Sequence, residues 1–115
     1  MFDYEKLEVY KRAKSFHQDM NSLMLNHPLD SVVKDQLKRA SLSVVLNIAE
    51  GTSRFSKADQ KRFFVIARGS LFESVAILDV LNDAQKIDNN LFQAHYTFGD
   101  ELSRILFAYI KKMET

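Results

Sequence analysis

Turn-forming residues are scarce along this chain of 115 residues, which contains three glycines and one proline. These two residue types supply most of the tight turns that β-hairpins need, so the chain has few places to reverse direction. Apolar residues recur instead with a period of about 3.6, which is typical of helices that bury one face. Both features favour a single domain, spanning residues 1–115, built from a few long helices.

The first half of the chain is expected to form two helices. The first extends from about Tyr4 to Leu25 and ends before Pro28, because proline lacks a backbone donor and restricts the residue that precedes it. The second extends from about Leu29 to Gly51. We expect Gly51 to end this helix in the left-handed conformation, which glycine adopts at little cost.

The second half is expected to form two more helices. The third begins after Ser56, which starts a Ser-x-x-Asp capping box with Asp59, and continues to about Lys86. Asp88 then caps a fourth helix from Asn89 to Met113. Four helices with short connections pack most simply as an antiparallel up-down-up-down bundle, so the predicted fold class is all-α.

The second and third helices carry more apolar side chains than one buried face requires. The additional ones are Leu42, Val45, Leu46, Phe63, Val65, Ile66 and Phe72. A helix that is apolar on two sides is usually buried on both, and a bundle of this size cannot cover both by itself. We therefore predict that the chain is homo-oligomeric.

Composition excludes several classes of protein. The absence of cysteine excludes disulfides and thiol chemistry. No apolar run approaches the roughly 18 residues of a membrane span, and the first residues are acidic rather than basic as in a signal peptide, so the cytoplasm is the expected location. The net charge of +1 conceals a basic segment, since residues 31–68 hold eight Lys or Arg against three acids. Such a segment can attract an anionic partner.

One stretch, Gln36 to Glu73, contains several short motifs in a fixed order. They are Gln36-Leu37-Lys38-Arg39-Ala40, Ser43-Val44, Asn47-Ile48-Ala49-Glu50-Gly51, Arg62-Phe63, Ala67-Arg68-Gly69-Ser70-Leu71 and Glu73. The stretch resembles the 23S rRNA intervening-sequence proteins, which are also labelled a ribosomal protein family. The start of the chain, Phe2 to Tyr10, is similar to the start of that family, so the resemblance covers nearly the whole chain.

The resemblance implies a homopentameric four-helix bundle and no established activity. In one departure, Val45 stands where the family has proline, which should straighten the second helix without removing its packing face. The accessory proteins of diversity-generating retroelements are a related group. They form basic pentamers that bind a reverse transcriptase and nucleic acid, a role that the near-neutral charge of this chain fits poorly.

Within this stretch, core packing does not account for several residues. They are Asn47, Glu50, Arg54, Arg68, Gly69, Ser70 and Glu73. Buried polar groups need partners, and antiparallel packing of two helices can bring Arg54 or Arg68 against Glu50. We predict a polar network that sets helix register and the subunit interface, with Gly69 in a patch of small residues that another helix can approach. A ligand site is the alternative interpretation.

Basic residues flank the connection between the second and third helices. They are Lys38, Arg39, Arg54, Lys57, Lys61 and Arg62. A ring of subunits would repeat this surface, and phosphate contacts of this kind give sequence-tolerant binding of RNA. An inert, solvated surface is the alternative. The leading hypothesis is an oligomeric module that binds RNA or a ribonucleoprotein, the second is a protein-binding scaffold without nucleic-acid binding, and the third is a helical-bundle ribonuclease.

The sequence provides little support for an enzyme. The three histidines, His17, His27 and His95, are scattered, and no Glu-x-x-His pair indicates a metal site in a bundle core. Arg12 and His17 match the Arg-x4-His spacing of certain helical ribonucleases, but five helical steps turn about 140°, so the two side chains do not share a face. We predict no catalytic, cofactor or metal-binding residues.

Overall fold

The computed structural model describes residues 1–114. Within them a short 3-10 helix, η1 (Asp3–Lys6), precedes four α-helices: α1 (Glu8–Asn26), α2 (Ser31–Thr52), α3 (Lys57–Asp83) and α4 (Asn89–Lys112). No strand occurs in the described part of the chain. The predicted all-α class with four helices is therefore confirmed.

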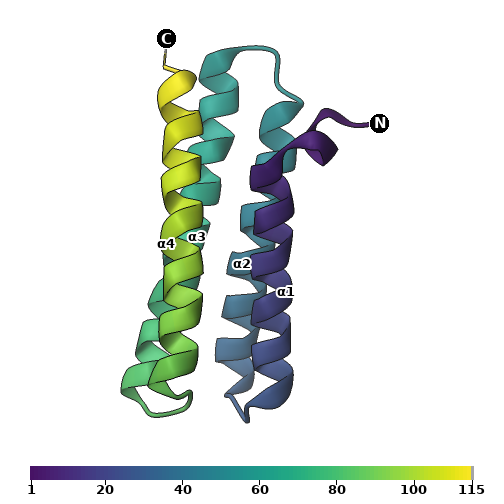
Figure 1. The fold of residues 1–115 in the computed structure, drawn as a ribbon. Helices are drawn as coiled ribbons and strands as arrows, with labels where there is room; N and C mark the ends of the chain where they lie inside the picture. Colours follow the sequence, from purple (N-terminus) through teal and green to yellow (C-terminus); the bar gives the residue numbers. More distant parts are fainter. Residues whose placement is uncertain (115) are drawn as a thin grey trace.

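The four helices form an elongated bundle of 44 × 23 × 21 Å. Each helix packs against its neighbour along the chain, and α1 also packs against α4, which closes the bundle. The connections α1–α2 and α3–α4 lie at one end, while the α2–α3 corner lies at the other end, near the C-terminal end of α4 (Figure 1). The two chain ends and the basic α2–α3 corner therefore occupy the same half of the molecule.

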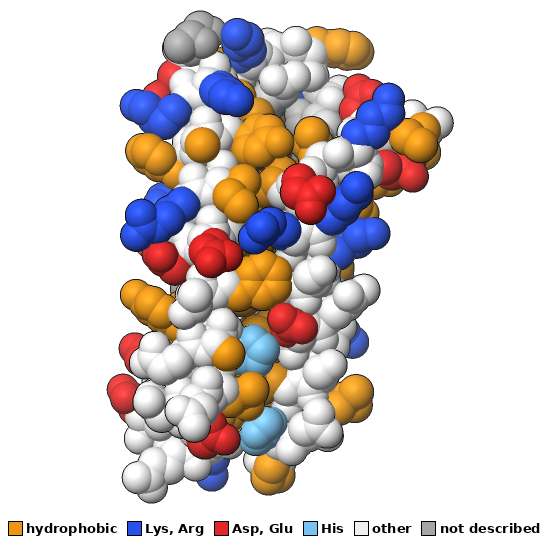
Figure 2. All heavy atoms as spheres, in the orientation of Figure 1, with side chains coloured by type: hydrophobic (Ala, Val, Ile, Leu, Met, Phe, Trp, Pro, Cys, Tyr) orange, Lys and Arg blue, Asp and Glu red, His pale blue; other side chains and the backbone are white. Residues whose placement is uncertain are grey.

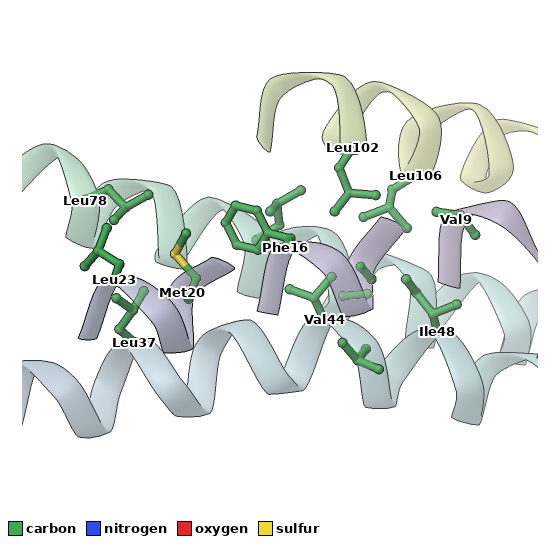
Figure 3. Close-up of a cluster of buried hydrophobic side chains, with 14 of the residues drawn as sticks. Val9, Phe16, Met20, Leu23, Leu37, Val44, Ile48, Leu78, Leu102 and Leu106 are labelled. Carbon is green, nitrogen blue, oxygen red and sulfur yellow. The ribbon is translucent and has the colours of Figure 1, made fainter. Parts of the chain in front are cut away.

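The core lies along the bundle axis and receives side chains from all four helices (Figure 3). Its largest fully buried members are Phe16, Met20, Leu37, Ile48, Phe64, Leu71, Leu78, Leu102 and Leu106. They recur at helical spacing, as the periodicity predicts. On α1 the core position belongs to Phe16 rather than to its neighbour His17, which is only half-buried.

Helix starts follow the capping residues. Ser56 Oγ accepts a hydrogen bond from the Asp59 amide at 3.1 Å, and Asp88 Oδ1 accepts one from Leu91 at 2.8 Å, so both residues are N-caps as predicted. Only this half of the predicted capping box is seen, because Asp59 Oδ1 lies against Arg62 Nη2 at 3.5 Å. Helix α2 begins two residues later than expected, because Asp30 is its N-cap. The first segment is not one continuous helix. Its backbone is extended at the residue between η1 and α1.

Gly51 does not end its helix in the left-handed conformation. No glycine in residues 1–114 has a positive φ, and α2 continues through Thr52. A Cβ atom at Gly51 would lie 2.8 Å from Cδ1 of Phe64, so this glycine permits close packing of α3 against α2. The predicted cap is therefore wrong. Glycine is needed at position 51 because a side chain there would not fit against α3, and not because the backbone is left-handed.

Helix α3 ends three residues earlier than predicted. Gln85 follows it with a positive φ of 59°. The amide of Lys86 donates to the Leu81 carbonyl at 2.9 Å, and that of Gln85 donates to the Asn82 carbonyl at 3.0 Å. This is the Schellman arrangement, which satisfies helix carbonyls that would otherwise lack donors. Glutamine holds the position that glycine usually takes.

Candidate functional site

A polar cluster joins α2 to α3 across their seam. Ser43 Oγ and Ser70 Oγ lie 2.8 Å apart. Asn47 Nδ2 donates to the Ser43 carbonyl and to Ser43 Oγ, both at 2.9 Å. Asn47 and Ser70, two of the predicted network residues, are thus brought together through Ser43, which the prediction did not include. The cluster is half-buried and links the two helices through hydrogen bonds.

A second cluster lies at the end of α2 and the start of α3. Arg54 Nη2 donates to Glu50 Oε1, as one of the two predicted pairings required. The guanidinium groups of Arg54 and Arg62 lie 4.5 and 4.6 Å from the ring centroid of Phe63. Gln60 Nε2 donates to the Arg54 carbonyl at 2.9 Å. The Arg54 side chain is therefore held by an ion pair and an aromatic ring, and its carbonyl accepts a hydrogen bond from Gln60.

The remaining predicted network residues lie elsewhere. Arg68 points toward α4, where its Nε donates to the Ser103 carbonyl at 3.2 Å and its guanidinium lies 4.7 Å from the ring of Phe72. Glu73 is exposed and makes no hydrogen bond or ion pair within residues 1–114. Gly69 is exposed, and nothing lies within 4 Å of its Cβ position. One continuous network is not formed within the chain.

We use the name basic corner for Arg54, Lys57, Lys61 and Arg62. Lys61 Nζ lies 2.9 Å from Glu114 Oε2, and Lys111 of α4 lies 3.0 Å from the same carboxylate. The hydrogen bond from Lys61, more than that from Lys111, lowers the pKa of Glu114. On the face shown in Figure 2, Lys and Arg side chains gather over the half of the bundle that holds this corner. The cations of the basic corner are therefore partly neutralised by ion pairs with acidic side chains.

Two of the predicted basic residues do not belong to this corner. Lys38 and Arg39 lie in α2, and Arg39 precedes Arg54 by fifteen residues. At 1.5 Å per residue this spacing corresponds to about 22 Å of helix. The six residues therefore form two basic regions, of which only the corner lies at the end of the bundle.

A partly buried polar contact between α1 and α2 was not predicted. His17 Nδ1 lies 2.7 Å from Ser41 Oγ, and Asn21 Nδ2 lies 3.3 Å from His17 Nε2. Ser41 Oγ donates in turn to the Lys38 carbonyl at 3.3 Å. Ser41 is completely buried, so its hydroxyl has no access for a substrate. Residues 24 positions apart on two helices gave no local signal of this contact.

Stability is expected to increase between about pH 5 and pH 7 and then to level off. Burial, aided by Lys38, lowers the pKa of His17 below 6.5. Burial also lowers the pKa of His95, against a smaller opposing effect of Asp19. The unfolded chain therefore binds more protons below pH 6.5, and stability is lost as the pH falls from there through the folded pKa values.

The test is the midpoint of thermal unfolding at several pH values and constant protein concentration. His17→Gln provides the matched control, because glutamine can bond Ser41 but does not titrate. The variant should show a shallower rise over the same range. A midpoint that is constant, or that falls as the pH increases, would contradict the prediction.

The structure does not bring Arg12 and His17 together. Arg12 Nη1 lies 3.5 Å from Glu101 Oε2 of α4, whereas His17 contacts α2. No group of three or more His, Asp or Glu side chains in residues 1–114 is arranged to hold a metal ion. Among the described helices, none combines the length and the apolar character that crossing a bilayer requires.

Two of the grooves on the surface of the bundle are lined by residues discussed above. One, of about 480 Å³, lies between α3 and α4 and is lined by Phe72, Val75, Tyr96 and Gly99 among others. The second, of about 610 Å³, lies between the N-terminal segment and α2. Asn47 and Glu50 line the second groove together with Phe2 and Tyr4. These two residues of the predicted network therefore border an open surface.

The comparison with known families identifies the chain. The model of the family described as 23S rRNA-intervening sequence protein matches residues 5–108, which is most of the sequence. The chain belongs to this family. The resemblance drawn from Gln36 to Glu73 and from the first residues is therefore confirmed. No curated protein matches this member of the family.

A solved structure has the same fold as this intervening-sequence protein. It is a protein of unknown function from the S23 ribosomal protein family of Bacteroides thetaiotaomicron. The two chains share 23% sequence identity with a TM-score of 0.84, and the match covers 90% of this chain and 98% of the other. At this identity the likeness shows the fold alone.

Proposed function

We propose that this protein is a non-catalytic interaction module of the cytoplasm. In this proposal, up-down-up-down four-helix bundles assemble into a homo-oligomer, a pentamer by family resemblance, which binds RNA or a ribonucleoprotein. The observation that carries the proposal is the combination of exposed apolar side chains on the outer helix faces with the basic corner at one end of the bundle.

Exposed apolar side chains support self-association. Leu46 of α2 is 55% exposed, Ile66 of α3 is 42% exposed, and Phe72 of α3 is 53% exposed. Leu42, Val65 and Phe107 are also exposed on α2, α3 and α4. Large apolar areas on a soluble protein usually mark an interaction surface. Gly69 lies on the outer side of α3 with open space around it, which leaves room for a helix of another copy.

The basic corner supports RNA binding. It places Arg54, Lys57, Lys61 and Arg62 within nine residues that contain one acid, Asp59. The ion pairs seen there are exposed, and such pairs contribute only about 0–1 kcal/mol, so phosphate can replace the carboxylates at little cost. Repetition of the corner in an oligomer would increase the apparent affinity through multivalency.

Self-association is tested by native mass spectrometry of the purified chain. The wild type should give one defined oligomer. The double variant Leu46→Asp with Ile66→Asp should dissociate, because unpaired carboxylates are costly to bury in an interface. Leu25→Asp is the matched control, since Leu25 is 86% exposed at the end of α1 and should leave assembly unchanged. A monomeric wild type would refute the oligomer.

RNA binding is tested by titrating labelled RNA with the protein over a range of salt concentrations. Lys57→Glu with Lys61→Glu should weaken binding roughly tenfold or more and reduce the salt dependence by about two counterions. Lys38→Glu with Arg39→Glu makes the same change in net charge away from the corner and should have a smaller effect. Equal effects of both pairs would contradict the assignment to the corner, and an absence of salt-dependent binding would refute RNA binding.

A protein-binding scaffold is the second candidate function. The groove between α3 and α4 favours it, because Phe72 and Tyr96 are exposed on opposite sides of that groove. Aromatic side chains of this kind are enriched in protein interfaces. A wild-type oligomer that binds no RNA at any salt concentration would favour the scaffold. The ribonuclease hypothesis loses support because Arg12 and His17 contact different helices.

A further inference from the structure

An aromatic side chain at the α2–α3 corner has no role in the fold. Phe55 lies in the turn between the two helices, and its exposure of 104% means that no part of it is covered. Phe63, eight residues later, is by contrast enclosed by two guanidinium groups. An isolated ring that extends into water contributes nothing to the core, so packing within the chain does not explain Phe55.

Two cations flank this ring in the sequence. Arg54 precedes Phe55 directly, and Lys57 follows two residues later at the start of α3. Arg62 lies beside Arg54 on Phe63, so the guanidinium groups of both belong to the same end of the bundle. The charge that develops at a helix N-terminus is also positive, and α3 begins two residues after the ring.

An exposed ring next to cations is the combination that binds single-stranded nucleic acid. Proteins that bind single-stranded nucleic acid combine positive charge for the backbone with aromatic side chains on which bases stack. In an RNA duplex the faces of the bases are stacked inside the helix and are unavailable to a side chain. An unpaired base can present its face to Phe55 while the neighbouring phosphates approach Arg54 and Lys57, whereas a base inside a duplex cannot.

We propose that Phe55 is a stacking platform for an unpaired base, so that the basic corner binds single-stranded RNA more tightly than double-stranded RNA. This inference rests on the proposed RNA binding and names its ligand more closely. Phosphate contacts by the corner account for affinity toward any RNA, whereas the ring adds a contact that requires an exposed base.

The experiment compares a labelled, unstructured RNA of about 20 nucleotides with the same RNA annealed to its complement. Phe55→Ala should weaken binding of the single strand roughly tenfold and leave duplex binding unchanged. Phe55→Tyr keeps the ring and should bind like the wild type. Tyr96→Ala removes an exposed aromatic side chain of α4 far from the corner and should also bind like the wild type.

The outcomes separate this inference from the proposed function. If the wild type binds RNA and Phe55→Ala binds the single strand equally well, stacking is refuted while RNA binding stands. If the wild type binds neither RNA form, the proposed function fails and the inference fails with it. If Phe55→Ala changes the subunit count in native mass spectrometry without changing RNA affinity, the ring is a contact between copies and the inference is refuted.

Discussion

Replacement of Phe16 by alanine is expected to lower the free energy of unfolding by about 3–5 kcal/mol. The ring is completely buried and packs edge-on against Phe98 of α4, with 6.0 Å between the ring centroids. Figure 3 shows it among side chains from other helices. Alanine would remove that apolar area and leave a cavity that the four helices cannot close. Domains of this size are stable by only about 5–15 kcal/mol, so the loss is large.

Urea denaturation at constant protein concentration measures this effect. The midpoint should fall while the dependence on urea concentration stays the same. Phe55→Ala makes the same chemical change at an exposed ring and should alter stability by less than about 0.5 kcal/mol. A loss below about 1 kcal/mol for Phe16→Ala would contradict the packing described for α1.

Gly51→Ala is expected to destabilise the fold by about 1–3 kcal/mol, although alanine is the better helix former. The added methyl group would lie 2.8 Å from Cδ1 of Phe64 and 3.2 Å from Cβ of Phe63. Neither atom is the free end of a flexible side chain, so the buried Phe64 ring or α3 itself must shift. Overpacking therefore outweighs the gain of about 1 kcal/mol in helix propensity.

Gly69→Ala is the matched control, because no atom lies within 4 Å of the Cβ position. In the isolated chain this variant should gain about 1 kcal/mol from helix propensity. Thermal unfolding of both glycine variants, with native mass spectrometry of each, separates the effects. Stabilisation by Gly51→Ala would refute the close approach of α2 and α3. If Gly69→Ala no longer forms the oligomer, a second copy of the chain must pack against α3 at Gly69.

Much of the fold follows from local patterns. A helix repeats every 3.6 residues, so the spacing of apolar residues reveals both the helix and its buried face, as it does for Phe64 and Leu71. Caps depend on residues three apart, so Ser56 and Asp88 could be recognised directly. Gln85 could not, because a left-handed glutamine has no local signature.

The candidate site was predicted less completely. Spacing along one helix shows that Asn47 and Glu50 are neighbours, but it does not show which residue of another helix faces them. Ser43 supplies the contact to Ser70, while Arg68 lies on the far side of α3 against α4. A difference of two positions turns a helix by about 200°, so Arg68 and Ser70 cannot share one network.

The sequence by itself determined the family and the four helices, because these depend on motifs and on periodicity within single segments. Only the tertiary structure decided what Gly51 does, which cations share the corner with Phe55, and where Arg68 points. These depend on the rotation and separation of packed helices, which arise from many weak contacts between segments distant in the chain.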